Sequence, residues 1–195
     1  MASPRERLLS TAAELFYSEG IGAVGVEKLC QTAGVSKRTM YQLFDTKSDL
    51  VAEALRTHGP RTVEGYFPPD DAGLTPRERI LHVFERLEDD AGRPGFHGCP
   101  FVNTSVELHD PSHRASTVAL HFKRLLESYF ERLAQQLDAP DPEVLAAQLT
   151  AVFDGCSVRA VMRAAPLDGL AVRTAAALLD AAITSEVIDT MPTAR

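Results

Sequence analysis

The stretch AGVSKRTMYQLFDTKSDL (residues 33–50) decides how the N-terminal part of this chain folds. It overlaps the end of VEKLCQTA (residues 26–33), a short helical pattern, and Gly34 can adopt the positive φ that a tight turn between two helices needs. Apolar side chains are spaced to hold two short helices at a steep angle: Leu29, Val35, Met40 and Phe44. The pattern predicts a helix-turn-helix whose second helix spans residues 36–44.

The rest of the chain also has helical patterns, with clear start signals. SPRE at residues 3–6 and TPRE at residues 75–78 each combine a hydroxyl N-cap, a proline at N1 and a glutamate at N3. Further starts stand at Thr46, Cys99, Asp110 and Asp141. We predict an all-α protein of about nine helices, at residues 4–19, 26–33, 36–44, 47–64, 75–92, 100–109, 111–138, 142–165 and 168–190. The Pro- and Gly-containing stretch GYFPPDDAGL (residues 65–74) is predicted to be a loop.

Composition limits the kinds of partner the chain can bind. Its 195 residues carry a formal net charge of −7, the opposite of what bulk DNA binding requires, so any nucleic-acid site must be local. The start, MASPRERLLS, lacks the apolar segment of a signal peptide, and no run approaches the roughly 18 uncharged apolar residues of a membrane span. We expect a cytoplasmic protein without a membrane partner. Three widely spaced cysteines suggest reduced thiols and not a disulfide framework: Cys30, Cys99 and Cys156.

The second helix of a helix-turn-helix lies in the major groove of DNA, with its N-terminal residues toward the base edges. In this chain Lys37, Arg38, Thr39 and Gln42 would then face the DNA, while Tyr41 and Lys47 could reach phosphates. Only Asp45 opposes these cations locally. A helix-turn-helix can also be a packing corner with a solvated polar face, so the pattern alone leaves both readings open.

Residues 20–50 resemble the DNA-binding domain of the TetR family of transcriptional regulators. The motifs that carry the resemblance are A-G-V-S at residues 33–36, T-M-Y at 39–41 and F-x-x-K at 44–47. By this resemblance Thr39, Tyr41 and Lys47 match positions that hold phosphates, and Lys37, Arg38 and Gln42 match positions near bases. It implies a helix-turn-helix DNA-binding domain at residues 1–46 and a helical regulatory and dimerisation domain at residues 47–195, without a cofactor.

The sequence departs from the family pattern at three places. Leu43 stands where the family commonly has a histidine that contacts phosphate, and Val24-Gly25 replace the usual Thr-Ser cap of the second helix. Glycine caps a helix without a side-chain acceptor, at a cost of a few tenths of a kcal/mol relative to serine. Glu27 would lie close to the DNA and repel it. We expect these changes to affect affinity and site preference.

The helices predicted at residues 142–165 and 168–190 are rich in alanine and have apolar faces. These faces could complete the core of one subunit, or they could pair with a second copy in a four-helix bundle. The resemblance supports the second reading, in which a two-fold dimer sets two recognition helices roughly 34–36 Å apart on a pseudo-palindromic operator. The residues predicted for this interface are Leu145, Leu149, Val152, Leu178, Leu179 and Ile183.

The stretch GFHGCPFVNTSVELHD (residues 95–110) mixes apolar and polar side chains around a glycine-rich entry into a helix, which suits a small-molecule pocket. The residues predicted to bind an effector, of unknown identity, are Phe84, Phe96, His97, Cys99, Phe101, Asn103, Glu107, His121, Phe122 and Phe153. Each aromatic among them could instead be an ordinary core residue. By the resemblance, effector binding would move the helix at residues 47–64 and release a repressor from DNA, with a coupling of about 1–3 kcal/mol.

The same stretch contains residue types that suit two other chemistries. His97, Cys99, His109 and His113 are ligand types that suit zinc, but Pro111 should break the helix between the last two, so no metal site is predicted. A thiol enzyme could use Cys99, at a helix N-terminus, with His97 or His121 as its base. No enzyme family pattern accompanies these residues, and we predict no enzymatic activity.

Overall fold

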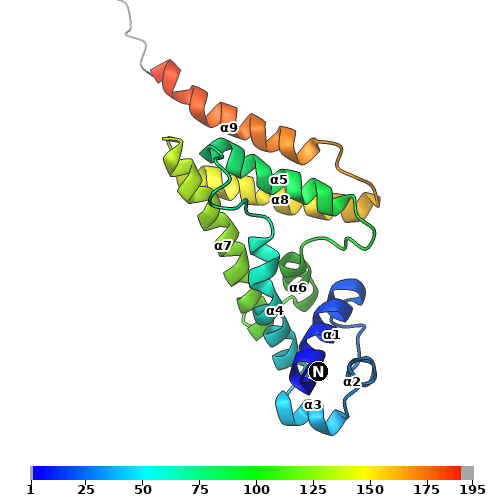
Figure 1. Cartoon of the computed structure of the whole chain (residues 1–195). Coiled ribbons are helices and arrows are strands. Elements are labelled where there is room, and N and C mark those ends of the chain that lie inside the picture. The colour runs from blue at the N-terminus through cyan, green and yellow to red at the C-terminus, as the bar shows by residue number, and fades with distance from the viewer. Residues whose placement is uncertain (1, 190–195) are drawn as a thin grey trace, which may run out of the picture. The chain divides into compact units, whose positions relative to one another are not determined.

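The computed structural model describes the backbone of residues 2–189 and the side chains of residues 2–182. This part of the chain contains nine α-helices and no strand, which confirms the predicted all-α class (Figure 1). The helices are α1 (Pro4–Glu19), α2 (Val26–Ala33), α3 (Lys37–Leu43), α4 (Lys47–Glu64), α5 (Pro76–Ala91), α6 (Pro100–Leu108), α7 (Arg114–Gln136), α8 (Pro142–Arg163) and α9 (Leu170–Asp189).

Most helices begin where their capping residues predict. Ser3 and Thr75 each accept a hydrogen bond from the N3 amide, and the N3 glutamates, Glu6 and Glu78, accept from the cap amides in return. Asp141 accepts from the amide of Val144 at the start of α8. These caps satisfy amides that have no partner within the helix, so they fix the start of each helix from local sequence.

Two predicted starts are wrong by more than one residue. Helix α7 begins at Arg114 and not at residue 111, because Asp110 Oδ1 accepts from both the amide and the hydroxyl of Ser112 and forms a turn instead. Helix α9 begins at Leu170 and not at residue 168, because Asp168 and Gly169 have φ values of 52° and 78°. Left-handed backbone cannot belong to a right-handed helix.

The helices form two compact units. The first contains Met1–Glu64 and His97–Lys123, and the second contains Gly65–Phe96 and the chain from Arg124 onward, so α7 contributes to both. These compact units differ from the predicted functional domains, DNA-binding at residues 1–46 and regulatory at residues 47–195, and that functional division stays a prediction.

The core of the first unit holds α1, α2, α3 and the start of α4 together. Its fully buried members include Leu8, Leu29, Met40 and Leu50, one from each of these helices. Phe44 is 6% exposed and Val35 is partly buried against the same cluster. The apolar positions predicted to hold the helix-turn-helix are therefore core residues.

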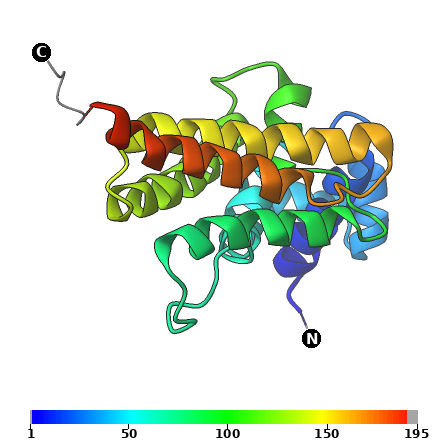
Figure 2. The same cartoon turned by 90° about the horizontal axis from the view of Figure 1, so that it is seen from above.

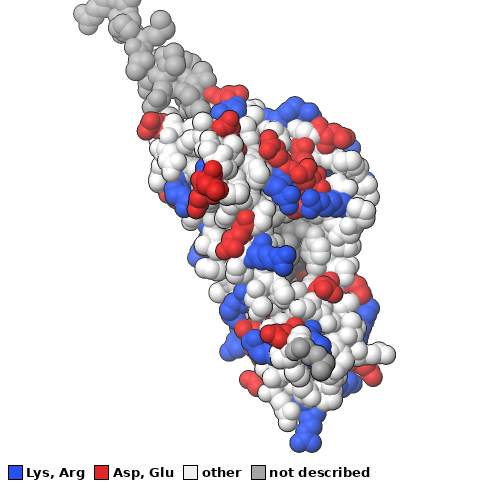
Figure 3. Space-filling view, in the orientation of Figure 1, with Lys and Arg blue, Asp and Glu red and all other residues white. Residues whose placement is uncertain are grey.

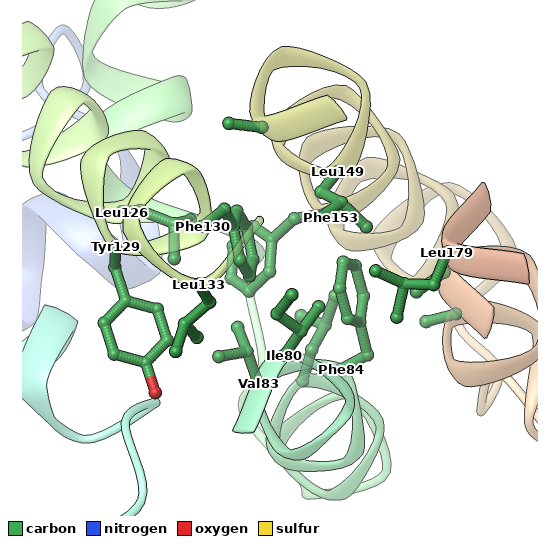
Figure 4. Close-up of a cluster of buried hydrophobic side chains, with 14 of the residues drawn as sticks. Ile80, Val83, Phe84, Leu126, Tyr129, Phe130, Leu133, Leu149, Phe153 and Leu179 are labelled. Carbon is green, nitrogen blue, oxygen red and sulfur yellow. The ribbon is translucent and has the colours of Figure 1, made fainter. Parts of the chain in front are cut away.

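The second unit packs α5, α8, α9 and the C-terminal part of α7 around an aromatic cluster (Figures 2 and 4). The rings of Phe84 on α5 and Phe130 on α7 stack with centroids 5.7 Å apart, and Phe153 on α8 meets Phe84 edge-on at 6.4 Å. Leu179 of α9 lies in the same cluster and is fully buried.

A carboxylate from α5 closes the start of α9. Glu88 accepts hydrogen bonds from the amides of Gly169 at 2.7 Å, Ala171 at 2.8 Å and Val172 at 3.1 Å. A negative charge is favourable at a helix N-terminus, where several amides lack intrahelical partners. The two partners are more than 80 positions apart in sequence, so no local sequence pattern predicts this contact.

Candidate nucleic-acid interface

The turn between α2 and α3 has the geometry that its sequence predicts. Gly34 has φ 64° and ψ 42°, and Ser36 caps α3 by accepting from the Thr39 amide at 3.0 Å. Arg7 of α1 holds the same turn by donating to the carbonyl oxygens of Ala33 at 2.9 Å and Gly34 at 3.2 Å. These contacts fix the direction of α3. No sequence pattern predicts the role of Arg7, because it depends on a contact between helices that are distant in sequence.

Helix α3 presents an exposed polar face on the side opposite its buried residue. Met40 is fully buried, while Lys37, Arg38, Tyr41 and Gln42 are exposed. Figure 3 shows acidic and basic side chains mixed over the visible face of the second unit and Lys or Arg side chains at the α3 end of the first. This face is one helix wide and carries Lys37 and Arg38. It belongs to the packed domain of α1, α2, α3 and the start of α4, here called the head, and has the width that major-groove reading requires.

Thr39 and Lys47 are less free than the other predicted DNA contacts. Thr39 is half-buried, and its hydroxyl lies 2.8 Å from that of Ser36. Lys47 is also half-buried; its ammonium donates to the carbonyl oxygen of Ile21 and lies 5.8 Å from the ring centre of Phe16. Burial lowers the pKa of Lys47, and the nearby carboxylate of Glu107 opposes that shift.

The departures from the family pattern have visible consequences. Leu43 is 39% exposed at the end of α3, and Gly25 caps α2 without a side-chain hydrogen bond. The carboxylate of Glu27 lies 3.4 Å from the ammonium of Lys37, so the acidic residue pairs with one of the predicted base-reading cations. An exposed pair of this kind contributes little to stability.

Comparison with known proteins identifies this head. The profile of bacterial regulatory proteins of the tetR family matches residues 8–54, which contain the whole helix-turn-helix. A solved structure from Streptomyces avermitilis, described as a candidate TetR transcriptional regulator, is 51% identical, covers 93% of this chain and 98% of its own, and superposes with a TM-score of 0.89. The chain belongs to the TetR family of transcriptional regulators.

Relatives of more distant sequence agree on the class of function. The HTH-type transcriptional regulator BetI of Rhizobium meliloti is 25% identical over 84% of this chain and 80% of its own length. The HTH-type transcriptional activator FasR of Mycolicibacterium smegmatis is 38% identical over 44% of this chain and 39% of its own length. This TetR-family protein is thus a DNA-binding regulator of transcription and not an enzyme.

Residues 97–110 of the predicted pocket segment pack within the first unit, against α1 and the turn that follows it, whereas Gly95 and Phe96 belong to the second unit. The hydroxyl of Tyr17 accepts from the amide of His97 at 2.9 Å and donates to the carbonyl oxygen of Gly98 at 3.0 Å. Asn103 donates to the carbonyl oxygen of His97 at 2.7 Å, so its amide group already has a partner. Glu107 accepts from the backbone amides of Ile21 at 2.8 Å and Gly22 at 2.5 Å.

The ten residues predicted to bind an effector are divided between the two units and differ in burial. Those in the second unit are Phe84, Phe96 and Phe153; the first and last are buried in its core, and Phe96 packs against it. In the first unit Phe101 and Phe122 are buried and stacked on each other with centroids 5.0 Å apart. His121 is exposed, while Cys99 is 7% exposed and caps α6. Glu107 accepts hydrogen bonds from backbone amides, and its contact with an effector stays a prediction.

The histidines and cysteines that suit a metal or a thiol chemistry are not gathered into one site. His109 ends α6 with φ 51°, whereas His113 places Nε2 3.0 Å from the hydroxyl of Ser48 and accepts at Nδ1 from Ala115. Among the residues with described side chains, no cluster of three histidine, cysteine or acidic groups is placed to hold a metal ion. Burial raises the pKa of Cys30 and Cys156.

The predicted interface residues on α8 and α9 divide by burial. Leu145, Leu149 and Leu179 are at most 3% exposed within a single chain, so their side chains complete the subunit core and are not available to a second copy. Val152 and Leu178 are half-buried against that core, and Ile183 lies outside the described side chains. The alternative reading of these faces, as subunit core, holds for the three leucines.

Helix α8 nevertheless has more apolar surface than the core covers. Its exposed apolar side chains include Val144 at 49%, Val158 at 40%, Val161 at 43% and Met162 at 80%. Among the described helices, α8 alone is long and apolar enough to cross a membrane. However, 44% of its most apolar stretch is buried inside the protein, as in the core helix of a soluble protein. It is a core helix with a second, uncovered apolar face.

Proposed function

We propose that this TetR-family protein is a cytoplasmic, ligand-responsive repressor that binds a pseudo-palindromic operator as a homodimer. The observation that carries the proposal is the exposed face of α3, where Lys37, Arg38, Tyr41 and Gln42 project from a domain with a buried apolar core. Arginine and lysine donate to guanine O6 and N7, and glutamine pairs with adenine. Tyr41 and Thr39 are assigned to phosphates, which set the register of α3.

The uncovered face of α8 supports the homodimer. Val144, Ala151, Val158 and Met162 recur at helical spacing and are exposed, and the glycine between them, Gly155, has no neighbour within 4 Å of an added Cβ. Small residues allow two helices to approach closely, and apolar surface buried between subunits contributes about 25 cal/mol per Å². We therefore assign the interface to the exposed face of α8 that contains Val144, Ala151, Val158 and Met162, and not to the buried leucines.

We assign effector binding to the regulatory region at residues 47–195. Two hydroxyls of α8, Thr150 Oγ1 and Ser157 Oγ, are buried and have no hydrogen-bond partner among the described residues. The residues stand seven positions apart, two helical turns, and so lie on one side of α8. A buried hydroxyl without a partner costs free energy, so a bound ligand with polar groups would stabilise this region.

The test is selection of bound sequences from a random double-stranded DNA pool, followed by a salt titration on the enriched sequence. The proposal predicts an inverted repeat with half-sites about one helical turn apart and a steep fall in affinity with salt. Tyr41→Ala should remove most of the affinity, whereas Val106→Ala, at a still more exposed position on α6, should leave it unchanged. Absence of enrichment at low salt from a folded protein would refute it.

The homodimer is tested separately, by sedimentation. Met162→Arg places a charge at the most exposed apolar position of α8 and should convert the dimer to a monomer. The matched control is Val106→Arg, which adds the same charge to another exposed apolar position. A dimer unaffected by the first change would place the interface elsewhere.

A further inference from the structure

We propose that Glu107 is a positioning residue for operator binding, which holds the α1–α2 turn and, through it, Lys47. The inference rests on the proposed function. Glu107 lies on α6, 86 positions from Ile21, and does not belong to the predicted helix-turn-helix. Its carboxylate is nonetheless bonded directly to the segment that leads into α2.

The turn is shaped around this carboxylate. Both oxygens are used: Oε2 accepts from Ile21 and Oε1 accepts from Gly22. A Cβ at Gly20 or at Gly22 would lie 3.2 Å from Oε1, so glycine at both positions leaves room for the charged group. Gly20 also has φ 91°, a conformation that side chains disfavour. Hydrogen bonds from amides to a carboxylate are stronger than neutral ones.

Lys47 belongs to the same network. Its ammonium donates to the carbonyl oxygen of Ile21, the residue whose amide binds Glu107. The peptide groups on both sides of Ile21 are therefore fixed by side chains from two other helices, α4 and α6. Since Lys47 is the predicted phosphate contact at the start of α4, its position on the DNA side depends on this turn.

The other end of α6 is fastened to α1. Tyr17 bonds both His97 and Gly98, immediately before the helix, as described above. Helix α6 is thus tied to the head at both ends. A cavity of about 200 Å³, lined in part by Lys47, Glu107 and Val51, lies beside the carboxylate. It provides space into which the turn or the lysine side chain can shift once the carboxylate is removed.

The first experiment needs no DNA. Amide hydrogen exchange followed by NMR should show protected amides at Ile21 and Gly22 in the wild type and exchange at least about 10-fold faster in Glu107→Ala, because the acceptor is lost. Glu14→Ala, an exposed acidic residue of α1, is the control for loss of charge and should leave both amides unchanged. Unchanged exchange in Glu107→Ala would overturn the contact itself.

The second experiment measures affinity for the operator that the wild type selects. Glu107→Ala should weaken binding by about 10-fold, a coupling of the size usual between linked sites. Combined with Lys47→Ala it should add little, because both changes remove the same constraint. Glu107→Gln keeps one acceptor oxygen and should bind with intermediate affinity. Additive effects, or an affinity equal to that of Glu14→Ala, would refute the positioning role, whereas a wild type without an operator would refute the proposed function alone.

Discussion

Gly59 lies inside α4, directly before Pro60, and its replacement by alanine tests how tightly α4, α6 and α7 are packed. A Cβ at this position would lie 2.7 Å from Cδ2 of Phe122 and nearer still to two other ring atoms. Real Cβ atoms do not approach this closely, so either the ring or the helix must move. Phe122 is 4% exposed and stacks on Phe101, which is 3% exposed, so the ring has no free space.

Two opposing effects set the magnitude. Alanine in place of glycine within a helix is worth about 0.8–1.0 kcal/mol. Overpacking a filled core costs about 1–3 kcal/mol, and the closeness of the ring puts this site near the upper end. We therefore expect Gly59→Ala to lower the free energy of unfolding by about 1–2 kcal/mol.

The assay is urea unfolding followed by circular dichroism at one protein concentration. Val106→Ala is the control, because Val106 is 61% exposed on α6 and its truncation should not lower the free energy of unfolding. Phe122→Leu removes ring atoms from the clash, so the double variant should be more stable than the sum of the two single effects. A Gly59→Ala protein more stable than the wild type by about 1 kcal/mol would refute the packing argument.

Three further predictions follow from named contacts. Glu88→Ala should lower the free energy of unfolding by about 2–3 kcal/mol, because it removes a charged acceptor from three amides. Glu85→Ala, on the exposed side of α5, is the control and should change the free energy of unfolding little. Equal effects of the two substitutions in urea unfolding would contradict the capping role of Glu88. The hydrogen bond from Arg5 lowers the pKa of Glu53 below its ordinary 4.5, so the contribution of Glu53 to stability is present above pH 4.5 and is lost as the pH falls through the lowered pKa. The melting temperature of Glu53→Gln should therefore depend less on pH below 4.5 than that of the wild type. An identical pH profile for the two proteins would refute the assignment. Arg7→Met keeps the apolar stem and removes the hydrogen bonds to the carbonyl oxygens of Ala33 and Gly34. It should weaken operator binding, and substitutions on α3 should change the affinity by the same factors in this variant as in the wild type. Undiminished affinity would show that the turn between α2 and α3 holds without Arg7.

Local signals predicted most of the helices because a cap and its helix are adjacent in sequence. Ser3 with Glu6 and Thr75 with Glu78 each satisfy neighbouring amides, so the pattern contains the whole interaction. The sequence predicts the start of α7 too early because Asp110 can serve as a helix cap or as the acceptor of a short turn. Local sequence does not distinguish these uses.

Contacts between distant segments were outside the reach of the sequence patterns. Glu107 was predicted to bind an effector because its segment mixes polar and apolar side chains, yet its partners are amides near residue 21. On α8, helical periodicity identified apolar positions but not which face the chain itself covers. Leu149 is fully buried and Val158 is 40% exposed, although both are apolar. Only the packing of α5, α7 and α9 decides between them.

The central claim is that α3 reads base sequence, and the most direct test repeats the DNA selection with Arg38→Ala beside the wild type. Arg38 is exposed on α3 and is assigned to a base edge, where one good bidentate pair discriminates by about 1–3 kcal/mol. We predict that the variant loses preference at one position in each half of the repeat and keeps it elsewhere. An unchanged preference at every position, from a variant that still binds, would show that α3 does not read the operator through this face.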